Sequence, residues 1–186
     1  MKLYIKCMVG IHCKMLVHDI LEKSGLHSAA IELGEVEILE NLTTEQRHLL
    51  KLMLVKSGFD LIEDKKAILV EKIKHLIIHM VHFADDLPTT KNSNYLSENL
   101  SKDYRYLAKV FSESTGTTIE RYIIAQKIER VKEYLLYNEM NLTQISYMLN
   151  YCSVAHLSNQ FKKLTGVSPS GYKQLGHNKR IPIENL

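Results

Sequence analysis

The sequence, 186 residues long, predicts an α+β protein made of two unlike halves. In the first half, short apolar runs that alternate like strands are separated by segments with helical spacing. In the second half the helical spacing continues throughout, and one pattern of residues recurs 50 positions later. A polar stretch at 85–94, which contains Pro88, predicts the boundary between the two halves.

The first half is expected to begin with a strand and a helix. Residues 3–8 alternate between apolar and polar side chains, which is typical of a half-buried strand. Residues 13–23 have helical spacing, and Gly25 is a natural residue at which to end that helix. The apolar residues at this spacing are Met15, Leu16 and Ile20.

Two further strands, at 28–33 and 35–39, are predicted to join at Gly34. Thr43 and Gln46 then have the spacing of a capping box, in which each side chain bonds the other residue's backbone N–H. A second helix therefore begins here. Its apolar residues are Leu49, Leu50, Leu52 and Met53, and it ends before Gly58.

A short strand at 59–62 and a long helix at 67–83 complete the first half. The resulting order, β-α-β-β-α-β, predicts a ferredoxin-like sandwich. We expect this accessory or sensor domain to cover 1–66, followed by a connecting helix and linker at 67–93. Its exposed strand edges could pair with a second subunit.

Residues 1–63 resemble heavy-metal-associated domains in length and in the stretch from Lys56 to Leu61. The resemblance implies soft-metal binding through a Cys-x-x-Cys pair after the first strand, but only Cys13 stands in the expected place. Cys7, His12 and Cys13 could form an unorthodox Cu(I) or Zn²⁺ site, because thiolate and imidazole suit both ions. A buried strand thiol and a loop thiol explain the same residues without a metal.

Three histidines, His75, His79 and His82, are spaced to share one face of the long helix. Such spacing can ligate a metal or sense pH. The opposite face is apolar, so a solvated stripe of histidines explains the pattern without a ligand. The apolar residues of that opposite face are Ile73, Ile77, Met80 and Val81.

The second half contains a duplicated unit of helix, tight turn, helix and Thr-Gly stop. Five residues of the first copy recur in the second copy 50 positions later, namely Leu107, Phe111, Thr115, Gly116 and Tyr122 as Leu157, Phe161, Thr165, Gly166 and Tyr172. Each copy has the form of a helix-turn-helix.

One long helix is predicted to join the copies. Thr117 would cap it, with Glu120 completing a capping box. The buried stripe of this helix is expected to be Ile124, Ile128, Val131 and Leu135.

The second helix of each copy has a polar outer face suited to the major groove of DNA. Asp103 should cap the first of these helices and Ser153 the second, and Leu157, Phe161 and Leu164 should face inward in the second. The candidate DNA-contacting residues of the first copy are Tyr104, Arg105, Tyr106, Ala108 and Lys109. Those of the second are Ser153, Val154, Ala155, His156, Ser158, Asn159, Lys162 and Lys163.

Residues 145–173 resemble the DNA-binding signature of the AraC/XylS family, most specifically in the run from Phe161 to Pro169. The resemblance covers 94–175, and 176–186 would be a C-terminal tail. It implies binding to double-stranded promoter DNA and activation by contact with RNA polymerase. The family usually has Gly-Phe in the second turn, where Asn150 and Tyr151 stand here; Asn tolerates the left-handed conformation, so the turn should survive.

Charge and composition agree with this function. Residues 1–87 hold 11 Lys and Arg against 13 Asp and Glu, whereas residues 88–186 hold 13 against 8, so the second half is the basic one. No run is long enough to span a bilayer and no signal peptide is evident, so we expect a cytoplasmic protein with no membrane partner and with reduced cysteines.

We expect no enzymatic activity and no cofactor, because the sequence has no phosphate loop, nucleophile elbow or zinc-protease motif. A homodimer and a small-molecule or metal effector stay open as partners. The alternative function is a soft-metal or thiol-binding carrier or interaction protein that acts through the first half.

Overall fold

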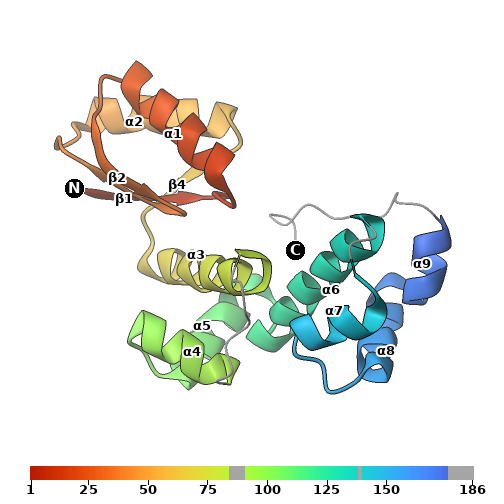
Figure 1. The fold of residues 1–186 in the computed structure, drawn as a ribbon. Helices are drawn as coiled ribbons and strands as arrows, with labels where there is room; N and C mark the ends of the chain where they lie inside the picture. The colour runs from red at the N-terminus through yellow and green to blue at the C-terminus, as the bar shows by residue number, and fades with distance from the viewer. Residues whose placement is uncertain (84–90, 138–139, 176–186) are drawn as a thin grey trace. The chain divides into compact units, whose positions relative to one another are not determined.

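The computed structural model describes residues 1–83, 91–137 and 140–175. The chain forms two compact units, Met1–His75 and Leu76–Leu186 (Figure 1). The expected boundary at 85–94 lies mostly outside the described residues. The division falls earlier, within one helix, and Asn92 and Ser93 of the expected linker already belong to a helix of the second unit.

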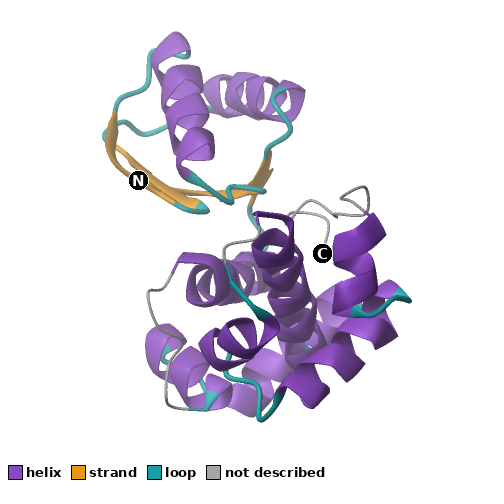
Figure 2. Ribbon diagram, turned by 45° about the vertical axis from the view of Figure 1, so that its right-hand side comes forward, coloured by secondary structure: helices purple, strands orange, loops and turns teal. Residues whose placement is uncertain are grey.

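The first unit has the predicted element order, with slightly shorter strands. The elements are β1 (Lys2–Lys6), α1 (Ile11–Lys23), β2 (Ser28–Glu32), β3 (Glu35–Ile38), α2 (Thr44–Lys56), β4 (Asp60–Ile62) and the start of α3 (Lys65–Ile78). The strands form one antiparallel sheet in the order β2-β3-β1-β4. The sheet and the helices of this unit are distinguished by colour in Figure 2.

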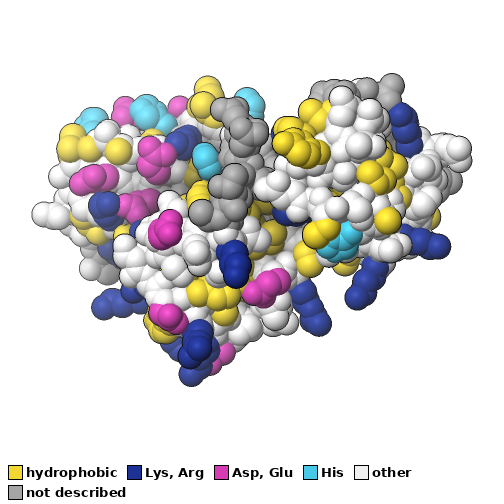
Figure 3. All heavy atoms as spheres, turned by 60° about the horizontal axis from the view of Figure 1, so that its bottom comes forward, with side chains coloured by type: hydrophobic (Ala, Val, Ile, Leu, Met, Phe, Trp, Pro, Cys, Tyr) yellow, Lys and Arg dark blue, Asp and Glu magenta, His cyan; other side chains and the backbone are white. Residues whose placement is uncertain are grey.

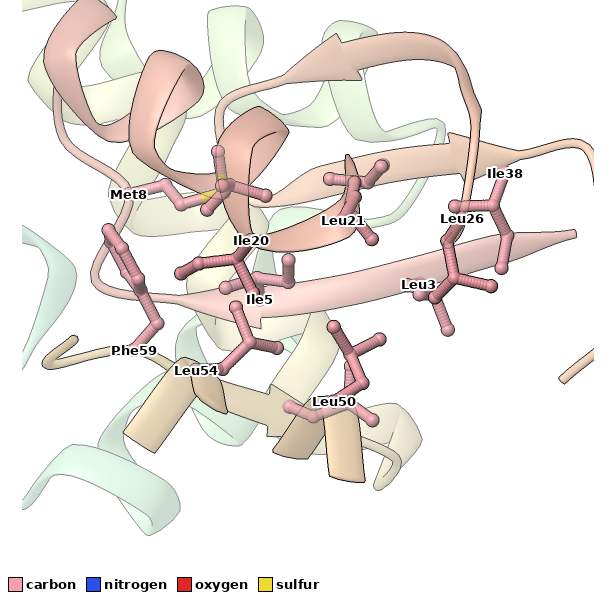
Figure 4. Close-up of a cluster of buried hydrophobic side chains, with 13 residues drawn as sticks. Leu3, Ile5, Met8, Ile20, Leu21, Leu26, Ile38, Leu50, Leu54 and Phe59 are labelled. Carbon is pink, nitrogen blue, oxygen red and sulfur yellow. The ribbon is translucent and has the colours of Figure 1, made fainter. Parts of the chain in front are cut away.

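The core of the first unit lies between the sheet and α1 and α2 (Figure 4). Alternate residues of the central strands are buried, as the pleat of a strand requires. The helices contribute Val17, Ile20, Leu21, Leu50 and Leu54.

Several of the apolar residues that marked the predicted helices lie outside this core. Met15 and Leu16 are 61% and 42% exposed, and Leu49 and Leu52 are 54% and 47% exposed. Both helices form as predicted, but neighbouring residues face the sheet instead. The buried residues are Val17, Ile20 and Leu21 in α1 and Leu50 and Leu54 in α2. A run of adjacent apolar residues does not by itself determine which of them faces the sheet.

The structure confirms the capping box predicted at Thr43 and Gln46 and the turn predicted at Gly34. The Thr43 side chain accepts a hydrogen bond from the Gln46 N–H, and the Gln46 side chain accepts one from the Thr43 N–H. Gly34 joins β2 and β3 with φ +77°, and an added Cβ would lie 2.0 Å from Cε1 of His75. Gly34 is therefore required both by its backbone conformation and by the imidazole packed against it.

The second unit is helical throughout its described residues. After the end of α3 come a π-helical turn η1 (His79–Phe83), α4 (Asn92–Leu100), α5 (Tyr104–Thr115), α6 (Ile119–Tyr137), α7 (Leu142–Met148), α8 (Val154–Thr165) and α9 (Pro169–Leu175). No helix in the described ranges is long and apolar enough to cross a bilayer.

The long helix α6 is the centre of this unit. Ile128, Val131 and Leu135 are buried as predicted, and Ile124 packs against the same cluster while partly exposed. The predicted cap is wrong by one residue: the Arg121 N–H donates to the side chain of Thr118, not of Thr117. Two adjacent threonines are chemically equivalent cap candidates, and the Gly116 turn decides which of them precedes the helix.

The predicted solvated stripe of histidines is wrong for two of its three members. His79 is exposed, but His75 is half-buried and His82 is buried. The π-helical turn of η1 contains more residues than an α-helical turn, so spacing based on 3.6 residues per turn assigns His82 to the wrong face. The apolar face opposite was predicted correctly, since Ile73, Ile77, Met80 and Val81 are buried.

Candidate nucleic-acid interface

The two helices predicted to enter the major groove, α5 and α8, are called recognition helices below. Both begin with side-chain caps. Asp103 accepts a hydrogen bond from the Arg105 N–H at 2.8 Å, and the Ser153 hydroxyl accepts one from the His156 N–H at 3.1 Å. Both caps were predicted. They fix the first turn of each helix, where outward side chains would meet base edges.

The two helices also end in the same way. Gly116 and Gly166 adopt left-handed conformations with φ +71° and +82°. The Thr115 hydroxyl donates to the Phe111 carbonyl at 2.7 Å, and the Thr165 hydroxyl donates to the Phe161 carbonyl at 2.8 Å. The sequence repeat is therefore a repeat of hydrogen bonds as well as of residue types.

Each recognition helix is anchored by fully buried leucine and phenylalanine side chains. Leu107 and Phe111 of α5, and Leu157 and Phe161 of α8, are all 0% exposed. Phe111 contacts Tyr122 with ring centroids 5.6 Å apart, and Phe161 contacts Tyr172 at 5.4 Å. Leu164, expected to face inward, is 54% exposed, so the inner face of α8 is narrower than predicted.

Most of the candidate DNA contacts lie at the surface. The exposed ones are Arg105, Tyr106, Lys109, Ser153, Ala155, His156, Asn159, Lys162 and Lys163. Tyr104, Ala108, Val154 and Ser158 are partly buried. Figure 3 views the molecule from the side that lies at the bottom of Figure 1, toward which α5 and α8 are placed, and Lys and Arg side chains project from this face.

The hydroxyl groups of two candidates, Tyr104 and Ser153, already form hydrogen bonds within the protein. The Tyr104 hydroxyl donates a short hydrogen bond to the Glu120 carboxylate, which ties α5 to α6. Partial burial, together with Glu120, raises the pKa of Tyr104 above its usual range, so the hydroxyl stays protonated as a donor. The Ser153 hydroxyl is the cap of α8, which limits its freedom to contact a base.

Sequence reasoning missed a set of contacts that supports the second turn. Nζ of Lys127 on α6 donates to the Leu149 carbonyl at 2.6 Å and lies 5.4 Å from the centroid of the Tyr151 ring. Burial lowers the pKa of Lys127. The Tyr151 ring in turn meets the His156 ring edge-on at 5.4 Å. The unusual Asn-Tyr pair in the turn was the available signal.

The turn itself forms as expected. Asn150 adopts the left-handed conformation with φ 51°, and the Tyr151 N–H donates to the Ser146 carbonyl at 2.9 Å. In the first copy Ser101 takes the equivalent conformation with φ 50°, and Nζ of Lys102 lies 5.8 Å from the Tyr106 ring centroid. Tyr106 and His156 are 50 residues apart, so a turn residue contacts the ring at the same position of both recognition helices.

A buried polar group fixes η1 on α6. The His82 Nε2–H donates to Oε1 of Gln126 at 3.0 Å, and Nδ1 lies 3.8 Å from the Glu133 carboxylate. Arg130 also pairs with Glu133, at 2.7 Å. Although burial opposes ionisation, the contacts with His82 and Arg130 lower the pKa of Glu133 to about 2.

The candidate metal ligands do not converge. Among the described residues no group of three or more His, Cys, Asp or Glu side chains is placed to hold a metal ion. Cys7 and Cys13 are half-buried and form no disulfide, and His12 is exposed. The Cys13 thiol lies 3.9 Å from the Cys7 carbonyl oxygen.

The model of a helix-turn-helix domain family matches residues 96–175, which include both copies and α6. This stretch is therefore a helix-turn-helix domain. The C-terminal domain of AraT, a response regulator from Geobacillus stearothermophilus, has the same fold, with a TM-score of 0.51 and 22% identity. The similarity covers 64% of this chain and 92% of that domain.

Two curated relatives are larger proteins described as uncharacterized HTH-type transcriptional regulators. YtdP of Bacillus subtilis is 25% identical over 158 residues, which are 80% of this chain and 20% of the relative. SAS0078 of Staphylococcus aureus is 29% identical over 93 residues, 50% of this chain and 12% of the relative. The chain therefore spans a fifth or less of the length of these relatives.

Proposed function

We propose that this chain is a sequence-specific regulator of transcription that inserts α5 and α8 into adjacent major-groove segments of promoter DNA. One observation carries the proposal: two copies with the same caps, stops and buried anchors present exposed polar residues at the same helical positions. Because both copies pack on α6, the two helices are held as a pair.

The dimensions of α6 support insertion into successive groove segments. Its 19 residues span about 28 Å, which is comparable to the ~34 Å of one turn of DNA. α5 packs near its first turns, through Phe111 and Tyr122, and α8 packs on its second half, through the cluster around Val131.

The exposed side chains have chemistry suited to distinct contacts. Arg105 matches the bidentate donor pattern that recognises guanine, and Asn159 matches the pattern that recognises adenine. The partly buried Val154 and the exposed Ala155 can contact a thymine methyl group, and His156 can bond a base edge. Lys109, Lys162 and Lys163 are suited to phosphate; Lys109 is 73% exposed and its pairing with Glu113, at 3.9 Å, is weak.

Activation through RNA polymerase belongs to this proposal as the expected consequence of promoter binding. The first unit would act as an accessory domain that senses an effector or joins two copies. Its element order and its strand order β2-β3-β1-β4 support a ferredoxin-like assignment. We advance no second function.

The test is binding to the DNA upstream of the protein's own gene, measured by fluorescence anisotropy at two or more salt concentrations. Lys109→Ala, Lys162→Ala and Lys163→Ala should each weaken binding to all sequences alike and reduce the salt slope by about 0.9. Lys51→Ala, which removes an exposed lysine of the first unit, is the matched control. Binding that does not depend on salt, or an equal effect of the control, would contradict the proposal.

A further inference from the structure

One side of α2 carries an exposed stripe of four residues, Glu45, Leu49, Leu52 and Lys56. Their spacing of four, three and four positions places them on a single helix face. Leu49 is 54% exposed and Leu52 is 47% exposed, and the two charged residues at the ends are also exposed. Neither leucine contributes to the buried core of the first unit.

The order of residues in this stripe is self-complementary. It is acidic, leucine, leucine, basic, with equal spacing from either end. When two such helices run antiparallel, Glu45 of one copy lies opposite Lys56 of the other, and Leu49 lies opposite Leu52. A two-fold symmetric interface requires this property, because the same surface must serve both partners.

We propose that this stripe is a homodimer interface, occupied by α2 of a second copy of this chain. The surroundings of the stripe support burial rather than exposure. Among the described residues, α1 and α2 carry six of the thirteen exposed large apolar side chains, so the helical layer is the apolar surface of this unit. Exposed apolar groups concentrated in this way mark interaction sites.

The edge of the sheet is a weaker candidate for the same role. β2 is an edge strand, but its register shifts between Ser28 and Ala30. A bulge of this kind distorts the edge and is a common device against edge-to-edge pairing. The interface therefore differs from the strand pairing that the sequence suggested.

The charged ends of the stripe have an alternative explanation, which an experiment can separate. Glu45 lies in the first turn of α2 and Lys56 in the last, so both also favour the dipole of their own helix. Reversing both charges would be unfavourable for the dipole, but it would restore the opposite-charge pairs between two antiparallel copies.

Sedimentation equilibrium of the intact chain tests the interface. The wild-type chain should associate to a dimer as concentration rises, and Leu52→Glu should weaken association at least about tenfold. Leu39→Glu is the matched control, because Leu39 is 70% exposed and lies outside α2. A wild-type chain that stays monomeric, or a control that weakens association equally, would overturn the proposal.

The charge reversal provides the second measurement. Glu45→Lys alone should weaken association by repulsion from Lys56 of the second copy, and adding Lys56→Glu should restore it. Thermal unfolding should meanwhile show the double variant to be the less stable fold, as the dipole predicts. If the double variant associates no better than Glu45→Lys, the charges serve the helix alone and the proposed pairing is wrong.

The interface does not depend on the proposed DNA binding, and the two can fail separately. A Leu52→Glu chain that is monomeric should still bind a single DNA site. Loss of DNA binding in a chain that dimerises would instead refute the proposed function and leave the interface intact.

Discussion

The two helix-turn-helix copies share their interior and differ in their outer faces. Leucine, phenylalanine, threonine and glycine recur at the same positions and make the same contacts. On the outer face, Arg105 and Lys109 of the first copy are replaced by Ala155 and Asn159 in the second. The comparison shows which positions build the domain and which are free to differ between the copies.

The copies also differ in how each is supported by α6. The first copy is tied through the hydrogen bond of Tyr104 to Glu120, whereas Val154 at the equivalent position of the second has no polar group. The second copy relies on Lys127, which caps α7 and contacts Tyr151. Similar helices are thus positioned by different side chains.

The largest expected effect tests the shared interior. Phe111→Ala and Phe161→Ala should each lower the free energy of unfolding by about 3–5 kcal/mol, because both rings are fully buried. Urea denaturation followed by circular dichroism measures this change. A much smaller loss at one site would show that the two copies are not equally packed.

The free energy of unfolding should depend on pH through Glu133, which lies in the half of α6 that supports the second copy. The folded pKa of Glu133, about 2, lies below its ordinary value of 4.5. Its contribution, up to about 3 kcal/mol, is therefore complete above pH 4.5 and is lost as pH falls toward 2. Glu133→Gln should flatten the dependence of stability on pH over that range in acid titrations. An unchanged slope in this variant would show that Glu133 is not its source.

Substitutions on the outer faces should separate the proposed specificities of the copies. Arg105→Ala and Asn159→Ala should each remove about 1–3 kcal/mol of discrimination, at different base pairs. Anisotropy with DNA carrying single base-pair changes locates each loss. Arg121→Ala, which removes an exposed arginine from α6, is the control. Loss at the same base pair in both variants would contradict separate recognition.

The smallest effect concerns the support of the first copy alone. Tyr104→Phe removes the hydrogen bond to Glu120 and should cost about 1 kcal/mol. Hydrogen exchange should become faster in α5 and stay unchanged in α8. Equal acceleration in both helices would show that this bond stabilises the whole unit.

The sequence predicted the features that depend on short-range chemistry. The caps at Thr43, Asp103 and Ser153 and the stops at Gly116 and Gly166 need only a few neighbouring residues to specify them. The repeat also predicted the helical unit, because two copies of one fold bury the same residue types at equivalent positions.

The sequence did not predict features that depend on which face of a helix a residue occupies, or on partners far away in the chain. The burial of His82 follows from a π-helical turn that no simple periodicity indicates. The partners Glu120 and Lys127 lie 16 and 22 residues from the groups they bond, so only the folded unit brings them together. Met15 and Leu49 have the expected helical spacing but lie outside the core, because spacing alone does not determine which residues of a helix face the sheet.

The common attachment of both copies to α6 sets a rule for the DNA that the chain can bind. A helix resists stretching, so the distance between α5 and α8 cannot adapt to a longer site. Under the proposed function, a few base pairs inserted between the two contacted segments would rotate one of them to the far side of the duplex. The spacing within an operator would then be constrained as strictly as its bases.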